Sequence, residues 1–320
     1  MNDTIYIDEA IPQWKGNFHT HTTLSDGRET PEKVITLYKN AGYNFLALSD
    51  HELYFDTDSF DSKNFIMLGG IECAIDAYPD NKWPIGKDRF TIHLHGIYDH
   101  SIDHKGARLS HLQKIERRID TGIDSWQEQI DYMRKNNLIV FLNHPRWSRI
   151  RPEYMLSMNG QIATEVYNYG CAVAECTGES EYEWDYALRN GKKLFCVATD
   201  DSHWYSPEKM QALGGFTMVQ STSLDKASIC SAIKKGDMYA SSGPVIKDMR
   251  IQEGKLLMKF SPASYVNIIS YDSYVPVFRS IDGSPIESME WPINSNGIKF
   301  IRAEIIGLDG KKAWSQPIYF

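Results

Sequence analysis

Two histidines separated by a single residue open the part of the sequence that could do chemistry. His19 and His21 lie at the end of an expected strand that runs from Phe18 to His21. Side chains in a strand repeat with a period of two, so both imidazoles point to the same side and converge on one point. Asp26 follows in a polar turn. Imidazole combined with carboxylate is a ligand set that suits divalent zinc, manganese or iron.

The same residue types recur where later apolar strands end. His51 follows the run 44–49, and His144 follows the run 138–142. The full set of candidate ligands is His19, His21, Asp26, His51, Glu72, His93, His144, Asp201 and His203. One zinc ion needs three or four ligands, so nine ligands at separate strand ends predict two or three divalent ions. His95 shares a strand face with His93, and the sequence favours His93 as the ligand without excluding His95.

The chemistry that such a cluster supplies is metal-assisted hydrolysis. Clustered ions would bind the oxygens of an anionic ester, polarise its electrophilic centre and lower the pKa of a bridging water from about 15.7 toward about 7. Arg146 and Arg149 could clamp a phosphate in bidentate fashion, or pair with surface acids. Asp50 and Asp200 are interpreted as ligands or as outer groups that orient a ligand histidine.

The elements that must position these residues alternate between strand and helix. Thr30 and Pro31 begin a helix that extends to Ala41. The strands before the candidate ligands are nearly continuous apolar runs, which is typical of a sheet buried on both faces. The segment 107–137 has apolar residues at near-helical spacing and predicts one or two helices. Polar residues at the ends of strands are typical of α/β barrels, whose catalytic residues lie at the carboxyl ends of the strands.

The length of the chain and the change in its sequence pattern after residue 244 predict two domains. An α/β barrel takes roughly 250 residues, so a chain of 320 residues leaves room for one small appendage. From Val245 onward, short alternating segments are separated by turns at Asp282-Gly283 and Asp309-Gly310. We therefore expect an α/β barrel domain over 1–244 and an accessory, sandwich-like all-β domain over 245–320.

The overall charge narrows the possible partners. A net charge of -8 argues against loose nucleic-acid binding or adhesion to an anionic membrane, both of which need a basic surface. The N-terminus has no apolar leader, and the longest apolar run, 138–142, is too short to span a bilayer. We expect a cytoplasmic protein whose contact with nucleic acid is limited to a possible nucleotide substrate. Trp83, Trp147 and Trp204 could stack on a base or sugar, or could simply pack; the oligomeric state stays open.

The order of the motifs resembles the PHP superfamily, the polymerase and histidinol phosphatase type of metallohydrolase. The resemblance covers roughly residues 14 to 205. The matching motifs are HxH (His19, His21), SDG (Asp26), SDH (Asp50, His51), GIE (Glu72), HxxG (His93), NHP (His144) and DxH (Asp201, His203). The run 239–244 followed by a β module is similar to the larger CehA/McbA-like PHP proteins. His95 departs from the pattern, because it replaces the apolar residue often found in that strand.

The resemblance implies a distorted (β/α)7 barrel and a trinuclear centre of manganese, iron or zinc. By analogy, His19, His21, Glu72 and Asp201 would hold one ion and a metal-bridging water. Glu72 would bridge to a second ion held with His93 and His144, and Asp26, His51 and His203 would hold the third. The implied activity is hydrolysis of phosphate monoesters or diesters of a small molecule. CehA/McbA-type relatives imply carboxylic or carbamate esters as the alternative, and a non-catalytic metal-stabilised scaffold is a third hypothesis.

Overall fold

The computed structural model describes residues 2–77, 90–102, 107–121, 124–271, 276–294 and 297–320. The helices are α1 (Pro31–Asn40), α2 (Asp124–Lys135), α3 (Pro152–Ser157), α4 (Tyr169–Glu175), α5 (Glu181–Arg189), the short 3-10 helix η1 (Pro207–Lys209) and α6 (Lys226–Lys235). The first twelve strands are β1 (Thr4–Ile7), β2 (Gln13–Asn17), β3 (Phe45–Ala47), β4 (Leu53–Tyr54), β5 (Ile66–Leu68), β6 (Gly70–Ala77), β7 (Phe90–Tyr98), β8 (Gln113–Lys114), β9 (Arg118–Thr121), β10 (Leu138–Leu142), β11 (Gln161–Asn168) and β12 (Phe195–Thr199). The remaining strands are β13 (Phe216–Gln220), β14 (Met238–Ser241), β15 (Ile246–Gln252), β16 (Lys255–Ser270), β17 (Val277–Phe278), β18 (Ile286–Pro292), β19 (Phe300–Gly307), β20 (Lys312–Ser315) and β21 (Ile318–Tyr319).

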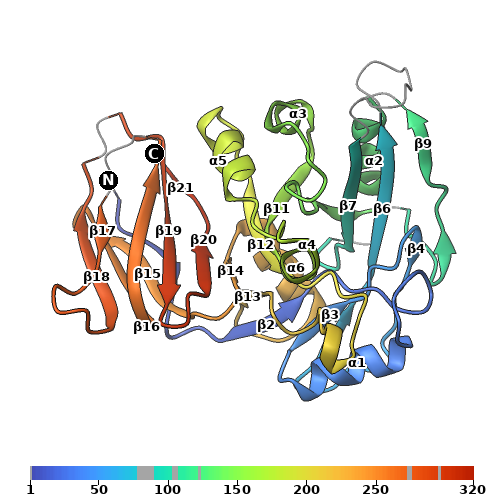
Figure 1. Cartoon of the computed structure of the whole chain (residues 1–320), viewed down its shortest axis with the longest axis horizontal. Helices are drawn as coiled ribbons and strands as arrows, with labels where there is room; N and C mark the ends of the chain where they lie inside the picture. The colour runs from blue at the N-terminus through green and yellow to red at the C-terminus, as the bar shows by residue number, and fades with distance from the viewer. Residues whose placement is uncertain (1, 78–89, 103–106, 122–123, 272–275, 295–296) are drawn as a thin grey trace.

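Two large sheets carry the site. One runs in the order β1-β15-β16-β19-β20-β14-β13-β2-β3-β5, and the other in the order β12-β11-β10-β7-β6-β9 (Figure 1). Strands β2, β3 and β5 are parallel, as are β10, β11 and β12, but β7 is antiparallel to both β6 and β10. The expected α/β class is confirmed. The (β/α)7 barrel is not, because in the described residues the two sheets do not close on each other.

The segment after β2 differs from the expected strand end. β2 stops at Asn17, and the backbone of the two histidines instead bonds to the segment that follows β12. The amide of Asp201 donates to the carbonyl of His19 at 2.8 Å, and the amide of His21 donates to the carbonyl of Ser202 at 3.0 Å. α1 begins at Pro31 as predicted, although the Thr30 side chain makes no capping hydrogen bond. This crossing of two chain segments positions the centre.

The segment 107–137 is only partly helical. α2 presents the buried side chains of Trp126, Ile130 and Met133 at helical spacing, as the pattern predicted. The expected helix before α2 is wrong, because β8 pairs with β4 and β9 pairs with β6. The apolar residues there have helical spacing, but parts of this segment form strands that pair with β4 and β6.

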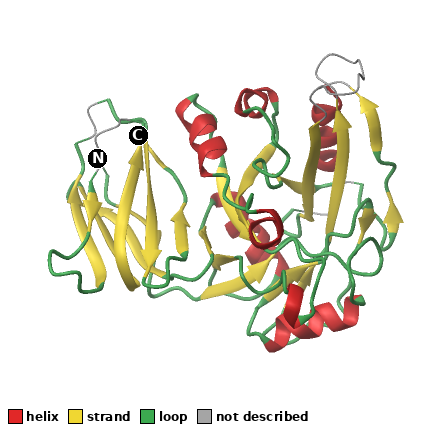
Figure 2. Ribbon diagram, in the orientation of Figure 1, coloured by secondary structure: helices red, strands yellow, loops and turns green. Residues whose placement is uncertain are grey.

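The C-terminal region consists of strands and loops alone among the described residues (Figure 2). Its long strand β16 pairs with β15 and β18 along its first half and with β19 along its second half, with register shifts around Ala263. A strand that changes partners at a bend forms the corner between two layers. β1 pairs with β15, so the start of the chain completes this β region, and β20 pairs with β14, so the sheet continues into the rest of the chain.

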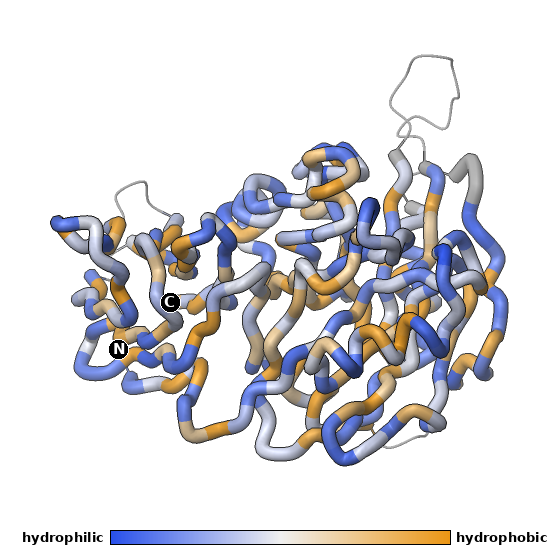
Figure 3. The backbone as a smooth tube through the Cα atoms, turned by 60° about the horizontal axis from the view of Figure 1, so that its bottom comes forward, coloured by the Kyte–Doolittle hydropathy of each residue, from blue (hydrophilic) through white to orange (hydrophobic). Residues whose placement is uncertain are grey.

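The β region has its own core and is also fixed to α5. Met258, Phe260 and Ile305 belong to this core, and Figure 3 shows hydrophobic residues in both parts of the molecule. The buried guanidinium of Arg302 donates to both carboxylate oxygens of Asp185 at 2.8 Å. The boundary between two domains at residue 244 stays a prediction.

None of the helices in the described part of the chain has both the length and the apolar character needed to cross a membrane.

Candidate metal centre

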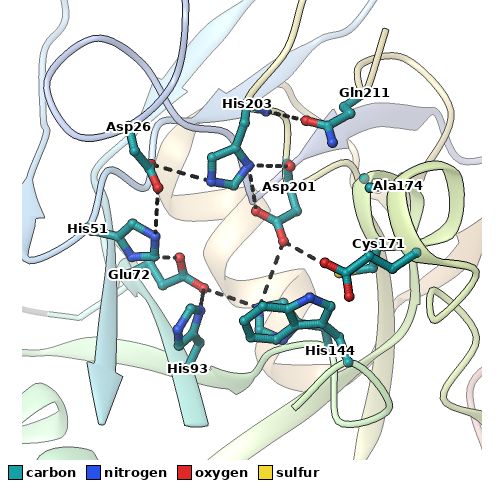
Figure 4. A pocket seen from close by; sticks show the side chains of 13 residues that line it. Asp26, His51, Glu72, His93, His144, Cys171, Ala174, Asp201, His203 and Gln211 are labelled. Atoms are coloured by element: carbon teal, nitrogen blue, oxygen red, sulfur yellow. Dashed lines mark hydrogen bonds and ion pairs between the residues drawn. The ribbon is translucent and has the colours of Figure 1, made fainter. Parts of the chain in front are cut away.

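All nine predicted ligands lie close together, and seven of them, all but His19 and His21, are labelled in Figure 4. They form four overlapping groups of potential ligand atoms. The groups are His21, Asp26, His51 and His203; His19, His21 and Asp201; His19, Glu72 and His144; and His51, Glu72 and His93. Glu72 comes from β6 and His93 from β7, whereas the other seven residues lie in the segments that follow β2, β3, β10 and β12. The groups share members, which is the arrangement that adjacent ions require.

The group of His19, His21 and Asp201 has the dimensions of a metal site. The Nε2 atoms of the two histidines are 3.1 Å apart, and each lies 3.1 to 3.2 Å from Oδ1 of Asp201. Tetrahedral zinc with ligands at about 2.0 Å has ligand atoms roughly 3.3 Å apart. The three atoms therefore form a nearly equilateral triangle of the size expected for one face of such a site. The residues present fit a divalent ion.

Glu72 lies between several imidazoles. Its Oε1 is 3.0 Å from Nδ1 of His93 and 3.1 Å from Nε2 of His19, and its Oε2 is 3.2 Å from Nδ1 of His51. Oε2 of Glu72 and Nδ1 of His51 are buried, and although they lie 3.2 Å apart, neither makes a hydrogen bond among the described residues. Buried polar atoms normally have partners, so these two atoms favour an ion as the missing partner.

Asp26 lies close to three histidines at the exposed side of the site. Its carboxylate oxygens lie 3.4 Å from Nε2 of His203, 3.6 Å from Nε2 of His51 and 3.6 Å from Nδ1 of His21. These contacts are longer than hydrogen bonds between the same atoms. A cation placed between them could be coordinated by all four side chains.

The electrostatics of the cluster favour cations. Burial alone would raise the pKa of Glu72, but the surrounding imidazoles, His19 first, hold it well below its usual range. Burial lowers the pKa of His51 to about 4. Burial also opposes the charge on His21, but the carboxylates of Asp201 and Glu72 outweigh it and raise the pKa of His21 to about 10. A divalent ion would replace a proton on His21.

The backbone around the ligands is strained and tightly packed. His144 and Asp201 have φ values of 23° and 51°, a left-handed region that residues with a side chain seldom adopt. A Cβ added to Gly27 would lie 2.5 Å from the carbonyl carbon and oxygen of His21, so only glycine lets the Asp26 loop cross there. Strain of this kind clusters at functional sites.

Comparison with solved structures identifies the fold. No family model matches the chain. A two-domain protein from Bacteroides vulgatus, containing a predicted PHP-like metal-dependent phosphoesterase, superposes with a TM-score of 0.51. The alignment covers 98% of this chain and 96% of that one at 14% identity. The chain has a PHP-like fold. The resemblance expected from the motif order is thereby confirmed for the fold, whereas the CehA/McbA-like resemblance of the C-terminal region stays a prediction.

Two further similarities are more distant. An amidohydrolase from Chromobacterium violaceum, with bound sulfate and no metal, has a TM-score of 0.43, 13% identity and alignment over 70% of this chain and 96% of that one. The DNA polymerase/3'-5' exonuclease PolX of Bacillus subtilis is 25% identical over 52% of this chain. The chain spans only 35% of the length of PolX.

Glu165, which was not among the residues predicted from the sequence, accepts hydrogen bonds from two of the candidate ligands, His19 and His144. It is buried in β11, and its Oε1 accepts hydrogen bonds from Nδ1 of His19 and Oγ1 of Thr199, both at 2.6 Å. Its Oε2 accepts from the amide of His144 and from Nδ2 of Asn168, both at 2.9 Å. A carboxylate on Nδ1 leaves the Nε2 lone pair of His19 free for a metal. The available signal was the one charged residue within this strand.

Asp50 and Asp200 lie behind the ligands. Asp50 accepts from the hydroxyl of Ser25 at 2.7 Å, and that hydroxyl is 3.4 Å from Nδ1 of His21. Asp200 accepts from Nδ2 of Asn17 at 2.8 Å, while Oδ1 of Asn17 accepts from the amide of His19 at 2.9 Å. Each carboxylate is linked to a candidate ligand histidine through one intervening residue.

His95 lies beneath the cluster and belongs to none of the four ligand groups. It is buried with its ring 5.1 Å from that of His19, and neither of its nitrogens has a hydrogen-bond partner within the described residues. The ring also packs on Phe141. This placement supports His93, whose Nδ1 is 3.0 Å from Glu72, as the member of the pair that faces the ligands.

A cavity opens over the ligands. It is lined by Asp26, His51, Glu72, His93, His144, Trp147, Gly170, Cys171, Ala174, Glu175, Asp201, His203 and Gln211. The indole of Trp147 lies edge-on to His144 at 4.8 Å, so this tryptophan forms one wall. Arg146 and Arg149 are exposed and are not among these lining residues, and Arg146 pairs with Glu183 at 3.2 Å. Substrate binding by either arginine stays a prediction, and Trp83 lies outside the described residues.

Proposed function

We propose that this chain is a metal-dependent hydrolase that cleaves phosphate esters of a small molecule. The observation that carries the proposal is the set of four overlapping histidine and carboxylate groups around one open cavity. A purely structural metal site is closed by its protein ligands, whereas a catalytic site keeps a position open. The fold, shared with a protein that contains a predicted PHP-like metal-dependent phosphoesterase, supports the same class.

Divalent ions held by these ligands would polarise the ester and lower the pKa of a coordinated water from about 15.7 to about 7. The side chains of this chain prepare the site. Glu165 keeps a proton on Nδ1 of His19 and so presents Nε2 to the centre. Glu72 offers its two oxygens to different histidine groups. Trp147 closes one side of the cavity and limits the access of water.

Two or three ions of manganese, iron or zinc are part of this proposal. Imidazole and carboxylate ligands suit all three metals. His19, His21 and Asp201 would hold one ion, and Asp26, His51 and His203 would hold a separate one at the mouth. Glu72, with His93 and His144, would lie between them. The substrate is proposed to be a small phosphorylated molecule.

The test is hydrolysis by metal-reconstituted protein of three chromogenic esters: p-nitrophenyl phosphate, bis-p-nitrophenyl phosphate and p-nitrophenyl acetate. Release of p-nitrophenol from either phosphate, lost in His19→Ala, supports the proposal. Cleavage of the acetate alone would replace it with the carboxylic ester hydrolase expected from CehA/McbA-type relatives. Bound metal without cleavage of any ester would favour the scaffold.

A further inference from the structure

Two cations share one indole beside the cavity. The guanidinium carbon of Arg28 and Nζ of Lys209 each lie 4.7 Å from the centre of the Trp204 ring. Both cations are exposed, and neither forms an ion pair with a carboxylate in the described part of the chain. The acidic neighbour Glu29 is paired with Lys33 at 2.8 Å. We call Arg28, Trp204 and Lys209 the cationic cluster.

The cationic cluster is attached to the metal centre by its backbone. Arg28 is two residues after Asp26, and Trp204 directly follows His203. The amide of Arg28 donates to the carbonyl of His203 at 2.9 Å. The side chain of Gln211, which lines the cavity beside His203 in Figure 4, accepts from the amide of Trp204 at 3.1 Å. These bonds place the backbone of Arg28 and Trp204 beside His203 and Gln211, which line the cavity.

The cavity itself offers no cationic side chain. Among its described lining residues the charged groups outside the histidines are Asp26, Glu72, Glu175 and Asp201. Divalent ions would neutralise a phosphate at the ligands, but a second anionic group of the substrate would meet carboxylates inside the cavity. The cationic cluster supplies two positive charges without a carboxylate partner among the described residues, and its members Arg28 and Trp204 lie next to Asp26 and His203 in the sequence. Cation–indole contacts hold both side chains in place before an anion binds, which reduces the entropy cost of binding.

We propose that the cationic cluster is a binding site for a second anionic group of the substrate. This inference rests on the proposed function and narrows it: the substrate is a phosphate ester whose remaining part carries another phosphate or a carboxylate. One anionic group would lie at the metal ligands and the other between Arg28 and Lys209. Trp204 provides the surface that positions the two cations.

The test compares two ligands that a phosphoesterase cannot hydrolyse, butane-1,4-diphosphonate and butylphosphonate, which differ by one anionic group on a flexible chain. Their dissociation constants are measured by calorimetry on metal-loaded protein. The double variant Arg28→Gln with Lys209→Gln is compared with Lys299→Gln, which removes an exposed cation 4.5 Å from the ring of Tyr271 in the β region. We expect the wild type to prefer the diphosphonate by about fivefold or more, given that exposed charge pairs contribute up to about 1 kcal/mol each.

The double variant should lose this preference, and Lys299→Gln should keep it. Equal affinities in the wild type, or a preference that survives in the double variant, would overturn the inference. If the double variant does not fold, as judged by its Tm, Arg28→Gln alone should reduce the preference. Turnover of p-nitrophenyl phosphate by the same wild-type preparation reports on the proposed function separately, because the phosphonates require no catalysis.

Discussion

The substitution Glu165→Gln tests how the centre is built. The carboxylate accepts four hydrogen bonds, two of 2.6 Å from His19 and Thr199 and two of 2.9 Å from His144 and Asn168. Glutamine has the same shape, but only one of its two terminal atoms accepts hydrogen bonds. Two of the four donors would therefore face an amide group, and His19 would lose the carboxylate that fixes its ring.

Loss of such a partner lowers metal affinity by about 10- to 100-fold, or roughly 1.4 to 2.8 kcal/mol. We expect the upper half of this range for Glu165→Gln, because the same carboxylate also holds the backbone amide of His144. The assay is competition for zinc against a chromogenic chelator. Glu183→Gln is the matched control, since Glu183 is also buried but pairs with Arg146 away from the ligands. An unchanged affinity in Glu165→Gln, or an equal loss in Glu183→Gln, would refute the reasoning.

Three further predictions concern individual groups. His95→Leu should keep its metal and gain up to about 1 kcal/mol in urea unfolding, because it removes two buried nitrogens without partners; loss of metal would show that His95 is a ligand. The pKa of His21 is raised from 6.5 to about 10, so in the metal-free protein the contribution of His21 to stability should be complete below pH 6.5 and be lost as the pH rises toward 10. Zinc affinity should rise over the same interval, because binding releases that proton, and a flat profile in thermal unfolding and chelator competition would contradict this. Gly27→Ala should lower metal content and Tm, since its Cβ would meet the backbone of His21 at 2.5 Å; an unchanged metal content by elemental analysis would contradict it.

The sequence predicted which candidate ligands lie together, because the ends of buried strands can be recognised from the sequence. Apolar runs such as 44–49 and 138–142 mark buried strands, and the polar residues that follow them must meet at one edge of the sheets. This reasoning does not require a closed barrel. It therefore brought His51 and His144 together with His19 even though the strands around the site belong to two separate large sheets.

Other features depended on contacts that no local pattern contains. Glu165 is a single carboxylate within its strand, and its role depends on contacts with residues distant in the sequence such as His19. The segment 107–121 has helical spacing, but its pairing with β4 and β6 decides its structure. The pairing of β1 with β15 joins residues about 240 positions apart, which periodicity cannot show. The cationic cluster likewise joins two loops.

The central claim is that nine side chains hold divalent ions, and the most direct measurement is the metal content of purified protein by elemental analysis after reconstitution with manganese, iron or zinc. We predict two or three ions per chain, with fewer in His19→Ala. Absence of bound metal after reconstitution would contradict the account.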